Sequence, residues 1–130
     1  MRFDRQELTA IFAGGAIGAV ARVWLSLHIV QRDTSWPWTI FAINVCGAFL
    51  LGYFVTRLQE RLPLSTYRRP LLGTGFCGAF TTFSTMEVEL LKMVQASCYG
   101  LALAYASASV VAGLVAIWLA STVVRRGRFA

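Results

Sequence analysis

The stretch GTGFCGAFTTFSTMEVE, from Gly73 to Glu89, places three glycines and five hydroxyl side chains inside an otherwise apolar part of the chain. Lipid offers no hydrogen-bond partners to free backbone groups, so a break in a helix at membrane depth needs protein or a watery cavity beside it. Transporters place their ion sites at broken helices of this kind. We therefore expect this stretch to carry the function.

The composition predicts an integral membrane protein. The chain has 130 residues, of which 57% are hydrophobic and only 14% charged, with a mean hydropathy of +0.62. A soluble domain of this length needs more charge to cover its surface. The net charge of +6 indicates basic loops and anionic lipid contact, because no aromatic–basic pattern favours nucleic acid. Cys46, Cys77 and Cys98 are expected to be free thiols.

Four apolar segments are each long enough to cross about 30 Å of hydrocarbon. They run from about 8 to 30, 36 to 55, 71 to 94 and 98 to 124. No linker or repeat divides the chain, so we expect a single transmembrane domain over residues 1–130. The third segment contains the break, and the predicted fold is an all-α membrane protein with four transmembrane helices.

Small residues recur at four-residue spacing in these segments. Gly14 and Gly18 form one pair, Ala48 and Gly52 another, and a stripe of glycine and alanine runs through the fourth segment. Such faces allow the backbones of two helices to approach closely. They serve packing within the chain, but a protein this small has little interior, so we also expect a second subunit.

The lysines and arginines predict the orientation. With four crossings, both ends of the chain and the link between the second and third segments share one side. That side holds nine arginines, namely Arg2, Arg5, Arg57, Arg61, Arg68, Arg69, Arg125, Arg126 and Arg128. Only Arg22, Arg32 and Lys92 lie elsewhere. The bias predicts a multi-pass protein of the cell membrane with both termini in the cytoplasm.

Three motifs together resemble the CrcB-type (Fluc) fluoride channels. They are GGAIGAVAR from Gly14 to Arg22, NVCGAFLLG from Asn44 to Gly52, and GFCGAFTTFST at 75–85, followed by Glu89. The resemblance implies an antiparallel, dual-topology dimer with two fluoride pores. It implies passive fluoride export that lowers cytoplasmic fluoride toxicity, and no enzymatic activity.

The resemblance also implies a structural sodium ion at the centre of the dimer, held by backbone carbonyls at the broken helices. By motif position these carbonyls belong to Gly78 and Thr81. Sodium prefers hard oxygen ligands, which unwound backbone supplies. The residues alone leave open the simpler reading that Gly78 only permits a kink.

A fluoride pore must replace the ion's water with hydrogen-bond donors. Asn44 offers two amide donors at membrane depth, although an interhelical hydrogen bond is the alternative. Phe83 has electropositive ring edges that suit an anion, and its place in the third motif favours a pore role over packing. Arg22 is expected to draw anions into a vestibule.

Two polar faces extend this pathway. Thr82, Thr85, Met86 and Glu89 share one helical face, with Ser84 beside it. Tyr105 and Ser109 form a second face on the fourth segment. Fluoride is expected to pass Ser84, Thr85, Tyr105 and Ser109, while Thr82 and the costly intramembrane acid Glu89 give polar support.

Three positions depart from the family pattern. Met86 stands where a second pore phenylalanine is expected, Thr39-Ile40 replaces Gly-Thr, and Gly113 replaces a serine. The charge bias also departs from it, because a chain that inserts both ways needs balanced loops. The second subunit is therefore either identical or an oppositely oriented homologue.

Two other functions remain open from the sequence alone. A small proton-coupled multidrug exporter also has four helices, but it needs an acid in its first segment, and none follows Glu7 there. A non-conducting subunit that only assembles with a partner is the other alternative, which Met86 and Gly113 favour.

Overall fold

The computed structural model describes residues 4–29, 36–60 and 67–127. Its elements are α1 (Arg5–His28), α2 (Trp38–Glu60), η1 (Pro70–Cys77), α3 (Gly78–Phe80), α4 (Phe83–Gln95) and α5 (Tyr99–Arg126). The described residues are almost entirely helical, which confirms the prediction of an all-α protein. Three helices are long and apolar enough to span a membrane: Arg5–His28, Trp38–Gln59 and Tyr99–Arg126.

The helix ends follow from local sequence. Asp4 caps α1, because its carboxylate accepts a hydrogen bond from the Gln6 N–H at 3.0 Å. Pro70 begins the wide π-helical turns of η1, where its missing N–H is tolerated. The tight link from α4 to α5 has Ser97 in the left-handed region at φ 59°.

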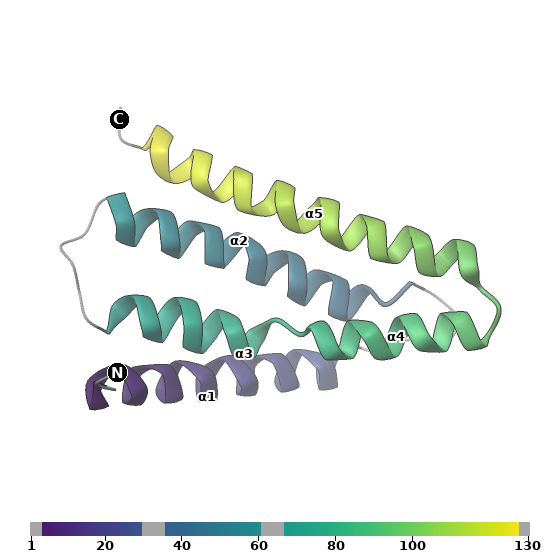
Figure 1. Cartoon of the computed structure of the whole chain (residues 1–130), viewed down its shortest axis with the longest axis horizontal. Helices are drawn as coiled ribbons and strands as arrows, with labels where there is room; N and C mark the ends of the chain where they lie inside the picture. Colours follow the sequence, from purple (N-terminus) through teal and green to yellow (C-terminus); the bar gives the residue numbers. More distant parts are fainter. Residues whose placement is uncertain (1–3, 30–35, 61–66, 128–130) are drawn as a thin grey trace.

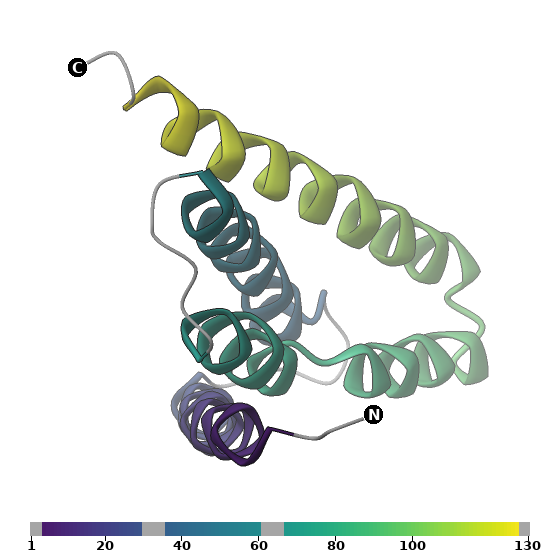
Figure 2. The same ribbon diagram turned by 60° about the vertical axis from the view of Figure 1, so that its left-hand side comes forward.

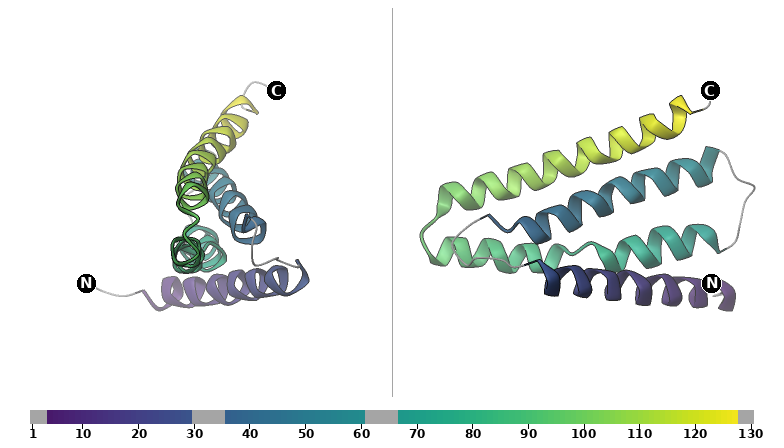
Figure 3. Two further views of the ribbon diagram at one scale, coloured as in Figure 1. Left: turned by 90° about the vertical axis from the view of Figure 1, so that its right-hand side faces the viewer. Right: turned by 180° about the vertical axis from the view of Figure 1, so that it is seen from behind.

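The elements stack in the order α1, broken rod, α2, α5, where the broken rod is η1, α3 and α4 (Figure 1). Seen along the rods, the described elements form an open stack rather than a closed bundle, and α5 lies far from α1 (Figure 3). The start of α1 and the end of α5 lie at the same end of the stack as the end of α2 and the start of η1 (Figure 1). Wide apolar faces are therefore exposed, including those of Phe12 and Leu103.

Glycines bring α1 directly against η1, as Figure 2 shows. A Cβ atom on Gly14 would lie 2.0 Å from the Leu71 carbonyl oxygen, and one on Gly18 would lie 2.3 Å from the Phe76 carbonyl oxygen. A Cβ on Gly75 would lie 2.6 Å from the Ile11 carbonyl oxygen. These contacts are with backbone atoms that cannot move aside, so only glycine fits.

Close packing also joins α2 to α5. A Cβ on Gly52 would lie 3.0 Å from the Ile117 backbone, and the Thr56 hydroxyl donates to Ser121 Oγ at 3.1 Å. Cys46, Cys77 and Cys98 are free thiols, as expected. The broken rod packs between α1, which it meets through the glycine contacts, and α2, which packs in turn on α5.

We predict that alanine lowers the stability of the protein at Gly18 but not at Gly113. Gly18→Ala forces α1 away from η1 and should cost about 1–3 kcal/mol of stability through overpacking. A Cβ on Gly113 meets no atom within 4 Å, so Gly113→Ala should be neutral or stabilising by up to about 1 kcal/mol. Thermal unfolding in detergent measures both. Equal destabilisation by the two substitutions would contradict the backbone contact at Gly18.

Candidate functional site

The rod of η1, α3 and α4 is broken at Thr81 and Thr82. α3 ends at Phe80, Thr81 is extended at φ −75° and ψ 153°, and Thr82 is extended at φ −144° and ψ 109°. α4 then begins at Phe83. The break lies near the middle of the rod, so its backbone groups need partners within the protein.

Asn44 of α2 pairs with both backbone groups of Thr82. The Thr82 N–H donates to Asn44 Oδ1 at 2.8 Å, and Asn44 Nδ2 donates to the Thr82 carbonyl at 3.1 Å. Both residues lie in partly buried surroundings, where an unpaired amide would be costly. The interhelical hydrogen bond that the sequence left as an alternative for Asn44 is therefore present, and one N–H of Asn44 remains to donate elsewhere.

The Thr82 side chain begins the second half of the rod. Its hydroxyl oxygen accepts from the Thr85 N–H at 3.1 Å and donates to Thr85 Oγ1 at 2.9 Å. It lies 3.4 Å from Ser84 Oγ. This is the N-cap of α4. The structure thus brings together four of the expected site residues: Asn44, Thr82, Ser84 and Thr85.

These bonds leave two carbonyl oxygens at the break without their usual donors. In a continuous helix the Thr82 N–H would donate to Gly78 and the Thr85 N–H to Thr81. Here the first donates to Asn44 and the second to the Thr82 hydroxyl. A Cβ on Gly78 meets no atom within 4 Å, so space lies beside it. Gly78 and Thr81, the two expected sodium ligands, therefore offer oxygens that fit a hard cation.

The aromatic and thioether side chains of the expected pore point in different directions. The Phe83 ring is 71% exposed in the single chain. Met86 packs instead on the buried cluster of Met93, Ala102 and Tyr105. Phe80, which stacks on Phe76 with ring centroids 5.5 Å apart, is buried. Phe83 is thus presented outward from the chain.

Tyr105 and Ser109 bring unpaired hydroxyls to the interface of α5 with the start of α2. Tyr105 is fully buried and meets the Trp36 ring edge-on at 5.4 Å. The oxygens of Tyr105, Ser109 and Thr39, with Trp36 Nε1, are buried without a hydrogen-bond partner in the described chain. The sequence did not lead us to expect Trp36 or Thr39 as site residues. The only signal was that Thr39-Ile40 replaces the Gly-Thr of the family pattern, which moves the hydroxyl by one position.

The charged site residues, Glu89 and Arg22, are not among these buried unpaired groups. Glu89 Oε1 lies 3.4 Å from Lys92 Nζ and forms an ion pair with it. The hydroxyl of Thr85, on the same helical face, accepts a hydrogen bond from the Thr82 hydroxyl instead. Arg22 is half-buried, one helical turn beyond Gly18, and a Cβ on Gly18 would lie 3.1 Å from the Phe80 nitrogen. Arg22 therefore lies on the face of α1 that leads to the break.

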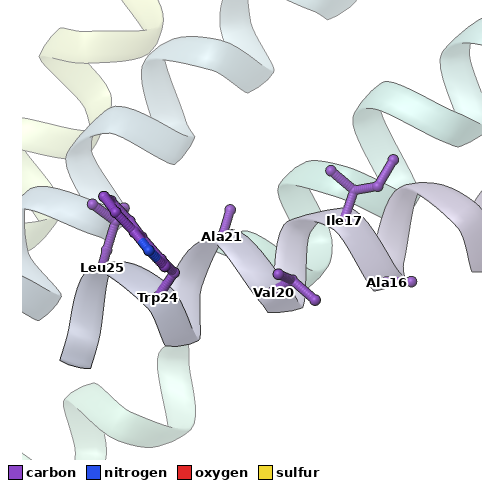
Figure 4. A pocket seen from close by; sticks show the side chains of 6 residues that line it. All are labelled: Ala16, Ile17, Val20, Ala21, Trp24 and Leu25. Carbon is purple, nitrogen blue, oxygen red and sulfur yellow. The ribbon is translucent and has the colours of Figure 1, made fainter. Parts of the chain in front are cut away.

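A large hollow elsewhere has no chemistry for ion binding. It measures about 640 Å³ and lies along α1 (Figure 4). Its lining is apolar: Ala16, Ile17, Val20, Ala21, Trp24 and Leu25. Nor do the described residues hold a group of three or more His, Cys, Asp or Glu side chains that could bind a metal. The candidate site is the break and its polar neighbours.

Apolar helices around a broken, hydroxyl-rich rod define a small membrane protein whose candidate functional site lies at a helix break. The sequence matches the family described as "CrcB-like protein, Camphor Resistance (CrcB)" over residues 9–121, and the chain belongs to that family. This confirms the resemblance seen in the three motifs.

Similar proteins are named fluoride-specific ion channels. The chain is 58% identical over 125 residues to fluoride-specific ion channel FluC 1 of Mycobacterium bovis and to that of Mycobacterium tuberculosis, covering 96% of this chain and 95% of each relative. It is 43% identical over 114 residues to fluoride-specific ion channel FluC of Acidobacterium capsulatum, covering 87% of this chain and 91% of the relative.

We predict that Asn44 protects the Thr82 amide from hydrogen exchange. Asn44→Ala removes the acceptor at 2.8 Å, and loss of a buried hydrogen bond worth about 1–3 kcal/mol should speed exchange roughly 10- to 100-fold. Ser121→Ala breaks the Thr56–Ser121 bond, which joins α2 to α5 and not to the break, and serves as the control. Unchanged exchange at Thr82 in Asn44→Ala would show that another group holds the break.

Proposed function

We propose that this chain is a subunit of a fluoride-selective channel that exports fluoride passively and lowers cytoplasmic fluoride toxicity. The observation that carries the proposal is its membership of the CrcB family together with 58% identity to proteins named fluoride-specific ion channels. The chain works as a channel and not as an enzyme. The geometry of the break supports this function.

Fluoride is small and strongly hydrated, so its path must offer donors that replace water. Asn44 keeps one free N–H, and Thr85 Oγ1 accepts from Thr82, which leaves its own proton to donate. The hydroxyls of Tyr105 and Ser109 have no hydrogen-bond partner among the described residues. Ser84 lies beside Thr82. A path along Asn44, Ser84, Thr85, Tyr105 and Ser109 is therefore lined with donors.

Phe83 and Met86 flank this path in our proposal. The electropositive edge of the Phe83 ring attracts an anion and excludes larger ones by its size. Met86 supplies a polarizable thioether without such an edge. The pore half that contains Met86 is therefore the weaker one. Arg22 supplies positive charge at the vestibule, and Glu89 stabilises the polar face of α4.

The channel needs a second subunit. Phe83 is 71% exposed, and an aromatic ring that lines a pore requires a facing wall, which the open stack does not supply. We propose that η1, α3 and α4 together make the fourth membrane crossing. Two oppositely oriented chains then meet at their breaks, and the partner is either a second copy or a homologue.

A structural sodium ion at this junction is part of the proposal. The carbonyls of Gly78 and Thr81 have lost their helical donors, and two subunits would bring two such pairs together. Backbone oxygens suit sodium, a hard cation. When bound, the ion would neutralise the carbonyl dipoles that face one another across the dimer.

Fluoride efflux from liposomes tests the function, first with this chain alone, where a second copy would complete the dimer, and then with an oppositely oriented homologue, which one-way insertion would require. We expect rapid, uncoupled efflux, and its loss in Phe83→Ile, because an aliphatic side chain lacks the electropositive ring edge. Phe12→Ile is the matched control, since Phe12 is 78% exposed on α1. Drug–proton exchange without fluoride efflux would show an exporter instead. A folded chain that stays silent with any homologous partner would show that it does not conduct.

The charge bias predicts that this chain inserts mainly one way, with both termini in the cytoplasm. Single cysteines added at each terminus, with Cys46, Cys77 and Cys98 replaced by alanine, should label from the cytoplasmic side only. Positive residues resist transfer across the membrane, so nine arginines fix the orientation. Equal labelling from both sides would contradict one-way insertion and favour a homodimer of two orientations.

A further inference from the structure

A groove at the arginine-rich end of the molecule has no part in the proposed ion path. It measures about 460 Å³ and lies between the start of α1 and the turn that leads into η1. Arg5, Gln6, Thr9 and Tyr67 supply polar groups, while Ala13 and Leu71 supply apolar ones. The groove is therefore mostly apolar with a few polar groups, one of them a guanidinium, whereas the hollow along α1 has no charged lining.

The groove lies where the charge of the chain is concentrated. By sequence, the chain ends and the link between α2 and η1 carry nine arginines and three acids, Asp4, Glu7 and Glu60. The remaining segments carry three basic and three acidic residues. By sequence, the whole net charge of +6 thus belongs to the segments next to one end of the stack, the end where α1 begins and α5 ends (Figure 1).

Arg5, the arginine among the residues that line the groove, is its basic group, and it has no acidic partner in the part of the chain that the structure describes. Among the described residues, neither Arg5 nor Arg69 forms an ion pair. Asp4, the nearest acid along the chain, accepts from the Gln6 N–H as the cap of α1. Thr9 donates to the backbone carbonyl of Arg5 at 2.7 Å, and Arg5 is an exposed residue of the groove lining.

We propose that this groove binds an anionic phospholipid from the leaflet at the arginine-rich end. The arginines attract the phosphate, and Tyr67, 54% exposed, lies at the headgroup level as interfacial aromatics do. One acyl chain lies on Ala13 and Leu71 between the two helices. Basic pockets between helices on the cytoplasmic side of membranes bind anionic headgroups by the same physics. The lipid would fasten α1 to η1 beside their glycine contact.

Native mass spectrometry of the full chain in mixed micelles of phosphatidylglycerol and phosphatidylcholine tests the proposal. The wild type should retain phosphatidylglycerol in preference to phosphatidylcholine. Arg5→Gln should lower that retention about fivefold, since one arginine near an anionic surface is worth about 1 kcal/mol. Arg126→Gln, at the same end but on α5, is the charge-matched control and should change little.

Two variants that add a bulky side chain to α1 distinguish lipid binding in the groove from a general attraction by positive charge. Ala13→Phe should abolish the preference for phosphatidylglycerol, whereas Ala16→Phe, which lines the apolar hollow, should keep it. Gel filtration checks that each variant is folded. Equal retention of both lipids by the wild type, or equal losses in Arg5→Gln and Arg126→Gln, would overturn the proposal. Loss of dimer without loss of lipid in Ala13→Phe would assign the groove to a second copy.

Discussion

The two-way hydrogen bond between Asn44 and the backbone of Thr82 is the constraint on which the site depends. One side-chain amide satisfies both the N–H and the carbonyl of an extended residue, as a neighbouring strand would. The cost of burying a broken helix is thereby met inside a single chain. Because the Thr82 N–H is held by Asn44, the Gly78 carbonyl stays without its helical donor. The break and the candidate ion ligand thus have one cause.

Glycine contacts on the opposite side fix where this break lies. Gly14, Gly18 and Gly75 allow α1 and η1 to touch backbone to backbone, so the first half of the rod has little freedom to slide. The same packing places Arg22, one turn beyond Gly18, on the face of α1 that leads to the break. α2 then supplies Asn44 from the other side. The hydroxyls of Thr82 and Thr85 begin α4 in the orientation that presents Phe83 outward.

Much of this arrangement can be predicted from the sequence. Hydropathy predicts the apolar helices, glycine spacing predicts the close face of α1, and the glycines and hydroxyls of Gly73–Glu89 predict the break. The pairing of Asn44 with Thr82 joins residues 38 positions apart, and no local pattern specifies it. Trp36 and Thr39 were missed for the same reason, since their lack of partners follows from packing against α5. The pore wall opposite Phe83 would come only from the second subunit that we propose.

The most direct test of the account is the ¹³C chemical shift of the Gly78 carbonyl, measured in sodium and then in N-methylglucamine. If Asn44 holds the break open and the freed carbonyl binds sodium, the shift should change between the two cations in the wild type. It should not change in Asn44→Ala, where the Thr82 N–H loses its acceptor and nothing holds the break in the geometry that presents the Gly78 carbonyl. The same shift in both cations for the wild-type protein would contradict the account.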